Sequence, residues 1–257
     1  IALGSESQRY NTTGQYNVSM GVGALRDNLG MSGSVAIGYQ SMMFANNSNV
    51  AFGETQNTAV GYESLKGSST SADNNSYGNT AIGHKSLSKN TTGQFNTALG
   101  TNSLLNNTTG RANVGLGPGA LGDNTIGYEN IGVGGDALDS NIDGYRNISI
   151  GLFSSYQNTS GFENTVIGYR SGNSNTEGSN NTLIGTRADV SNNTLVNATA
   201  LGANAIVNAS HKIRLGDSNI TVIEGQVAFT NSSDRRLKQE IKSTKYGLEE
   251  VLKLKPV

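Results

Sequence analysis

Four short stretches share one pattern: residues 79–83 read NTAIG, residues 96–100 read NTALG, residues 164–168 read NTVIG and residues 181–185 read NTLIG. Each ends in a glycine, and these glycines belong to a series with a step of 17 residues. The series comprises Gly83, Gly100, Gly117, Gly134, Gly151, Gly168, Gly185 and Gly202. A step this regular is typical of one structural unit copied end to end.

The series continues toward the N-terminus with less regular spacing. Gly61 precedes Gly83 by 22 residues, which indicates one longer coil. The earlier members are Gly53, Gly38, Gly21 and Gly4, and the last three again follow the step of 17. Most of the chain is therefore a single repeat array.

The unit that follows Gly100 illustrates the other repeated positions. A small residue, Ser103, comes three positions later, and a large apolar residue, Leu104, comes next. Asn107 and a second glycine, Gly110, follow at seven and ten positions. Asparagine and glycine tolerate positive φ, so these two positions predict the corners of the unit.

Two short β-like runs separated by these corners fit a narrow coil. Seventeen extended residues span at most ~56 Å, which suits one turn of a β-solenoid whose stacked turns are roughly 4.8 Å apart. We expect Leu104 to face the core as the partner of Leu99, which precedes the glycine. The predicted fold is all-β, a parallel β-solenoid of 17-residue coils.

The composition leaves little apolar material for a single-chain core. Hydrophobic residues make up 35% of the chain, aromatic residues 6%, and tryptophan is absent. Burial of so little apolar surface is marginal against the ordering entropy of a glycine-rich chain. We therefore expect an obligate oligomer whose chains approach each other at the small Ser/Ala column. The alternative is a single-chain solenoid in which this column is a tight inner corner.

The charge, cysteine and hydropathy data bound the class of protein. The net charge is -1, so nothing suggests a nucleic-acid partner. The chain has 0 cysteines and no run of 18 apolar residues, so we expect neither disulfides nor insertion into a membrane. The sequence begins in mid-motif, with residues 1–4 reading IALG, and we expect it to be an internal fragment.

No metal or cofactor site is predicted. Residues 117–122, GPGALG, fit a dinucleotide-binding pattern, but they occupy repeat positions and no βαβ context follows. His84 and His211 are far apart in the array, so they predict surface residues rather than a triad or a zinc site. Three acids of one coil are read as solvated loop residues rather than calcium ligands: Asp136, Asp139 and Asp143.

The repeat motif resembles the head repeats of trimeric autotransporter adhesins. Residues 34–38, SVAIG, and residues 79–83, NTAIG, carry this resemblance, together with the small residue three positions later. It implies a homotrimer, in which each chain has two identical partners. That family usually has a shorter repeat than 17 residues.

The C-terminal part is similar to a different family. Residues 211–216 (HKIRLG), 225–227 (GQV), 230–238 (TNSSDRRLK) and 254–257 (LKPV) resemble the junction before the endosialidase-type intramolecular chaperone, peptidase family S74. Such chaperones terminate phage tail fibres and tailspikes, trimerise the chain and then cleave themselves off. The resemblance implies cleavage at the Ser233–Asp234 bond, with Ser233 as nucleophile and Lys238 as its base. Burial near Arg235 and Arg236 would lower the lysine pKa, as a general base requires.

These resemblances define the expected organisation. Residues 1–216 form the solenoid, residues 217–233 a β-rich neck, and residues 234–257 the helical start of a chaperone that continues beyond Val257. Residues 234–257 hold 7 Lys/Arg against 4 Asp/Glu, a change of composition that agrees with this boundary.

The expected function is that of a structural and receptor-binding segment of a homotrimeric phage tail fibre in the virion, with a host glycan or surface protein as receptor. Autoproteolysis, which requires the complete chaperone, is the one enzymatic activity expected. A head domain of a bacterial surface adhesin is the alternative, and a polysaccharide-degrading tailspike is the second. A Ser/Asn-rich stretch, residues 66–77, interrupts the period; it fits a plain surface insertion, with receptor contact as the alternative.

Overall fold

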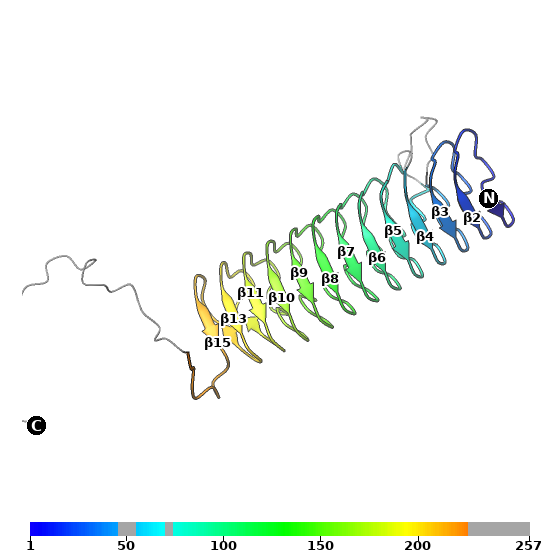
Figure 1. The fold of residues 1–257 in the computed structure, drawn as a ribbon. Helices are drawn as coiled ribbons and strands as arrows, with labels where there is room; N and C mark the ends of the chain where they lie inside the picture. Colours follow the sequence, from blue (N-terminus) through cyan, green and yellow to red (C-terminus); the bar gives the residue numbers. More distant parts are fainter. Residues whose placement is uncertain (46–54, 70–73, 226–257) are drawn as a thin grey trace, which may run out of the picture. The chain divides into compact units, whose positions relative to one another are not determined.

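The repeat array folds into a parallel β-solenoid with no helix in the part of the chain that the structure describes. The structure is a computed structural model, and it describes residues 1–45, 55–69 and 74–225. Residues 1–219 form one compact unit, in which the strands stack side by side (Figure 1). The prediction of a parallel β-solenoid with 17-residue coils is confirmed.

One short strand from each coil enters a 13-stranded parallel sheet. Neighbouring strands pair in register at the repeat spacing, so Thr80 lies opposite Thr97 and Ile82 opposite Leu99. The strands of this sheet are β1 (Ala2–Leu3), β2 (Val18–Met20), β3 (Val35–Ile37), β4 (Thr58–Val60), β5 (Thr80–Ile82), β6 (Thr97–Leu99), β7 (Val114–Leu116), β8 (Ile131–Val133), β9 (Ile148–Ile150), β10 (Thr165–Ile167), β11 (Thr182–Ile184), β13 (Thr199–Leu201) and β15 (Ile213–Leu215).

The phase of the first long coil differs from the prediction. Ile37 of β3 pairs with Val60 of β4, so the coil that begins at Gly38 runs on to Gly61. The glycine at position 53, which the sequence suggested as an intermediate member of the series, lies outside the described residues.

The two β-like runs expected in every coil are wrong for most of the array, because the second run contains left-handed residues. Asn102 and Leu104 have φ of 58° and 52°, and equivalent residues of other coils behave alike. Only near the C-terminal end does a second sheet form among the described residues, between β12 (Asp189–Val190) and β14 (Ile206–Val207). The strands alternate with regions of tight turns, which explains the narrow coil.

The repeated glycine is required by close stacking of coils. Gly100 has φ of 141°, and a Cβ atom there would lie 2.5 Å from the carbonyl oxygen of Gly117 in the next coil. The second glycine has a different role from the one predicted. Gly110 is not among the residues with positive φ; a Cβ atom there would lie 2.3 Å from Asn107 Oδ1 and 2.4 Å from the Gly127 carbonyl oxygen.

The core contains one of the two apolar columns that the sequence placed there. Leu104 is fully buried, whereas Leu99 is 49% exposed. Side chains alternate across a strand, so the inward position of β6 is Ala98 and both of its neighbours face outward. The prediction that the residue before the glycine faces the core is therefore wrong.

The small Ser/Ala column lies inside each chain, as the inner-corner alternative requires. Ser103 is fully buried, and its hydroxyl donates to the carbonyl oxygen of Gly115 at 2.9 Å. Ala120 and Ala137 are buried in the same way. Because these residues are covered by their own chain, the expectation that this column brings chains together is wrong.

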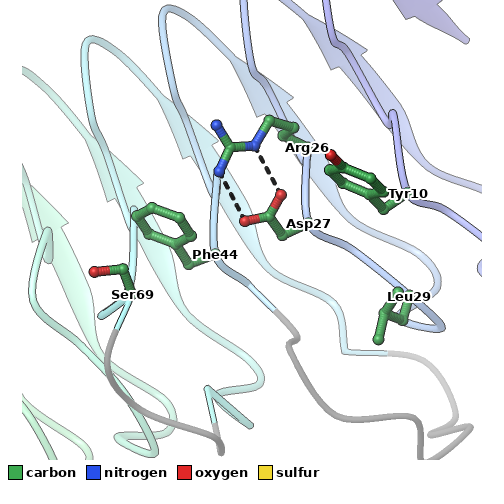
Figure 2. Close-up of a pocket in the computed structure, with 6 residues that line it drawn as sticks. All are labelled: Tyr10, Arg26, Asp27, Leu29, Phe44 and Ser69. Carbon is green, nitrogen blue, oxygen red and sulfur yellow. Dashed lines mark hydrogen bonds and ion pairs between the residues drawn. The ribbon is translucent and has the colours of Figure 1, made fainter.

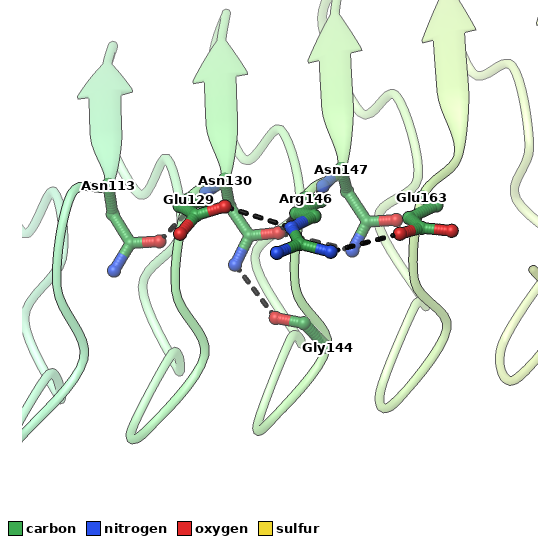
Figure 3. Close-up of polar contacts among 7 residues, drawn as sticks. All are labelled: Asn113, Glu129, Asn130, Gly144, Arg146, Asn147 and Glu163. Carbon is green, nitrogen blue, oxygen red and sulfur yellow. Dashed lines mark hydrogen bonds and ion pairs between the residues drawn. The ribbon is translucent and has the colours of Figure 1, made fainter.

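Two ladders of buried asparagines run along the middle of the solenoid. In the first, Asn124 Nδ2 donates to Asn107 Oδ1 at 2.8 Å, and Asn141 Nδ2 donates to Asn124 Oδ1 at 2.7 Å. In the second, the backbone N–H of Asn130 donates to Asn113 Oδ1, and Asn130 Nδ2 donates to the Gly144 carbonyl oxygen (Figure 3). Buried amides that are hydrogen-bonded in this way fill the coil without the penalty of unpaired polar groups.

Candidate binding surfaces

The residues predicted to cleave the chain cannot be placed. Ser233, Asp234 and Lys238 all lie outside the described residues, as do Arg235, Arg236 and the whole expected chaperone start, residues 234–257. Of the expected β-rich neck, residues 217–225 are described and contain no strand. The candidate sites that the structure describes are surfaces of the solenoid.

The first candidate is the sheet face, which we define as the outward side chains at the first and third positions of the strands of the 13-stranded sheet. The third position is a large apolar residue in every one of these strands. In β9 both positions are isoleucine: Ile148 and Ile150 are 37% and 39% exposed. The sheet face is therefore a continuous apolar stripe along the whole sheet, a feature that marks interaction sites on soluble proteins.

Aromatic side chains border one edge of the sheet face. The residue directly after the repeated glycine is aromatic in three successive coils: Tyr39, Tyr62 and His84. Their rings stack at 5.1 Å and 5.2 Å between centroids. His84 and His211 are both exposed, as predicted. This stack extends the ring-bearing surface beyond the strands.

Charged residues border the other edge. Arg146 donates from Nε to Glu129 at 2.9 Å and from Nη1 to Glu163 at 3.2 Å, which links three coils (Figure 3). Beside this ion-pair ladder, Tyr128, Tyr145 and Phe162 stack at 4.9 Å between successive centroids. Exposed ion pairs contribute little to stability, so this border is better read as a surface feature than as a source of fold energy.

The second candidate is a groove on the turn segments of the coils. Its first hollow has a volume of about 420 Å³ and is lined by Tyr10, Arg26, Asp27, Leu29, Phe44 and Ser69 (Figure 2). Arg26 makes a two-pronged ion pair with Asp27 at 2.7 and 2.9 Å, and its guanidinium lies 5.5 Å from the Phe44 ring centroid. The fixed pair with Asp27 holds Arg26 in one orientation at the floor of the hollow.

Two further hollows continue this groove along the array. The second, of about 460 Å³, shares Phe44 and Ser69 with the first. The third, of about 560 Å³, shares Lys89 and Thr108 with the second and reaches Thr159. We call the three together the corner groove. It crosses successive coils, and most of its lining follows the repeated glycine by five to eight positions.

The sequence signalled these surfaces only in part. The apolar residue before the glycine was visible as a repeat, but its outward direction depends on strand alternation, which the sequence pattern did not fix. Part of the irregular stretch at residues 66–77 does line the corner groove, through Lys66, Gly67, Ser68 and Ser69. Tyr10, Arg26 and Phe44 carry no motif, and only the coil phase brings them together.

Metal and membrane features are limited to two findings. Within residues 1–45, 55–69 and 74–225, no group of three or more His, Cys, Asp or Glu residues is placed to hold a metal ion. In the same described residues, no helix has the length and apolarity needed to cross a bilayer.

Comparison with known proteins adds no identity. No protein-family model, curated protein or solved structure matches this chain. The fold and its surfaces therefore carry the functional argument.

Proposed function

We propose that the chain is a structural and receptor-binding segment of a homotrimeric phage tail fibre, in which the sheet face is the surface between chains. The observation that carries this proposal is the apolar stripe that extends over all 13 strands of the sheet. A stripe of this length left in water favours aggregation, so it needs a partner. The resemblance to adhesin head repeats and to the S74 junction supports a trimer and a phage fibre.

Two copies of the same chain are the partners that fit the sheet face. The stripe repeats once per coil, at roughly 4.8 Å along the axis. A partner that matches it along its full length must have the same repeat, and a second solenoid of this sequence has it by construction. Closed cyclic symmetry lets three such faces enclose one apolar core.

Charge substitutions on the sheet face test this part of the proposal. Ile131→Glu combined with Ile148→Glu puts two carboxylates on adjacent strands, β8 and β9, and we expect loss of the trimer in sedimentation velocity. The matched control is Ile126→Glu combined with Ile142→Glu, whose side chains are 54% and 49% exposed but lie off the sheet. The proposal fails if the sheet-face variant sediments like the unmodified trimer.

The proposal includes folding by a C-terminal chaperone that then cleaves itself off. In a longer chain that carries the whole chaperone, we expect a cut between Ser233 and Asp234. Ser233→Ala removes the attacking hydroxyl and Lys238→Ala removes its base, so both variants should give uncleaved trimers by mass spectrometry. Efficient cleavage of the Lys238→Ala chain at the same bond would refute the assigned roles.

A head domain of a bacterial trimeric adhesin is the second candidate, because the same repeats and the same apolar face suit it. Antibodies to the solenoid distinguish the two: labelling of virion tails favours the fibre, and labelling of the bacterial envelope favours the adhesin. A polysaccharide-degrading tailspike is a third candidate. It would replace the fibre proposal if the purified chain shortened a surface glycan without a partner protein.

A further inference from the structure

We propose that the corner groove is a binding site for an uncharged linear polysaccharide that lies along the solenoid axis. This inference rests on the receptor-binding function proposed above and assigns its ligand class and its residues. The groove spans coils from Tyr10 to Thr159, far longer than a compact small molecule requires. Its length and direction suit an extended polymer.

The position of the groove leaves it open in an assembled fibre. Its lining comes from turn segments that follow the glycine by five to eight positions, with Glu63 as the exception. The sheet face comes from the strands that precede the glycine. A partner on the sheet face therefore does not use the residues of the corner groove, and both surfaces can act at once.

The polar groups of the groove repeat from coil to coil. The hydroxyls of Thr91, Thr108 and Thr125 each donate to the backbone carbonyl of the following coil, at 3.0 to 3.1 Å. Each donor is thereby fixed, and the lone pairs of these oxygens remain available to accept from sugar hydroxyls. A linear glycan meets the same acceptor at every coil.

Amide and ammonium groups complete this pattern. Asn106 Nδ2 donates to Asp123 Oδ1 at 2.7 Å, while Asn106 Oδ1 is buried without a hydrogen-bond partner in the described residues. Lys89 takes part in no ion pair among those residues, so its three N–H donors face the groove's solvent. Such mixed donors and acceptors are suited to sugar hydroxyls.

The charges of the groove favour an uncharged ligand. Arg26 is paired with Asp27, and Lys66 is paired with Glu63 at 2.7 Å. Lys89 and Asp123 in the third hollow have opposite charges. Cations and anions therefore balance, and the half-exposed ring of Tyr10 adds an apolar surface on which a sugar ring can rest.

Binding measurements with a matched pair of variants test the site. The probes are uncharged capsular and O-antigen polysaccharides, purified from bacterial strains to which the full chain adsorbs, and binding is followed by fluorescence anisotropy. We expect Tyr10→Ala combined with Lys89→Ala to weaken binding at least tenfold. The control, Tyr77→Ala combined with Arg111→Ala, removes an exposed ring and a cation outside the groove and should leave binding unchanged.

The outcomes separate this inference from the proposed function. If the chain adsorbs to cells but none of the purified polysaccharides binds, or if the groove variant binds as well as the control, the groove assignment is wrong while receptor binding stands. If the chain adsorbs to no strain, the receptor-binding function itself is wrong. Binding of acidic polysaccharides alone would also overturn the assignment to uncharged glycans.

Discussion

The middle and the C-terminal end of the solenoid have the same coil spacing but different interiors. Between Asn79 and Asn181, amide ladders run alongside a column of leucines. Beyond Gly185, the core is aliphatic and includes Val190 and Val207. The second sheet, β12 with β14, forms there, where the asparagine seven positions after the glycine is exposed at position 192. The repeat glycine thus sets the spacing of the coils, whereas the side chains between glycines decide whether turns or strands fill the second half.

The largest effect is expected from a charge in the leucine column of the middle region. Leu104 is fully buried, so Leu104→Asp places a carboxylate in a core that has no cation to pair with it. We expect insoluble protein or loss of the cooperative unfolding transition in circular dichroism. Leu105→Asp, one position along and only partly buried, is the control. A soluble, native-like Leu104→Asp trimer would show that the coil phase is wrong.

The next effect concerns the glycine that stacks on the asparagine ladder. A Cβ atom on Gly127 would lie 2.3 Å from Asn124 Oδ1 and 2.4 Å from the Gly144 carbonyl oxygen. We expect Gly127→Ala to destabilise the fold by on the order of 3 kcal/mol in denaturant unfolding. At Gly135 the nearest atom is the flexible end of Leu152, at 2.9 Å, so Gly135→Ala should cost much less. Equal costs would contradict the close packing described for the ladder.

A smaller effect is expected from the ladder amides themselves. Asn124→Ala removes bonds to Asn107 and Gly127 and leaves the amide of Asn141 without one acceptor. We expect a loss of about 2 kcal/mol of unfolding free energy, measured at equal protein concentration. Asn158 Oδ1 already lacks a partner, so Asn158→Ala should cost less. The reverse order would show that the ladder is not continuous through Asn141.

The smallest effect is a gain of stability in the middle region. Burial raises the pKa of Asp139 to about 6, and the nearby charges of Asp123 and Asp136 raise it further within that value. Because the folded state holds this proton more tightly than the unfolded chain, stability should fall as the pH rises from about 4 to about 6. Asp139→Asn should flatten that profile and add roughly 1 kcal/mol at pH 7, after allowance for solvent screening of a half-exposed group. An unchanged profile in thermal unfolding would contradict this origin.

The sequence predicted the coil spacing, the parallel β-solenoid and the burial of Leu104, because each depends on a short repeated motif. It did not predict that Leu99 faces outward, since three residues of strand are too few to establish alternation. The left-handed residues Asn102 and Leu104 were also missed, because neither side chain favours positive φ and stacking between coils imposes it. The corner groove joins residues without a shared motif, so only the structure brings Tyr10, Arg26 and Phe44 together.

The central claim is that the apolar sheet face is covered by two further copies of the chain. Sedimentation equilibrium of the unmodified chain at micromolar concentration tests it most directly, together with circular dichroism to establish that the material is folded. The account predicts a single species with three times the mass of one chain and no folded monomer on dilution. A stable, folded monomer with its sheet face exposed to water would contradict it.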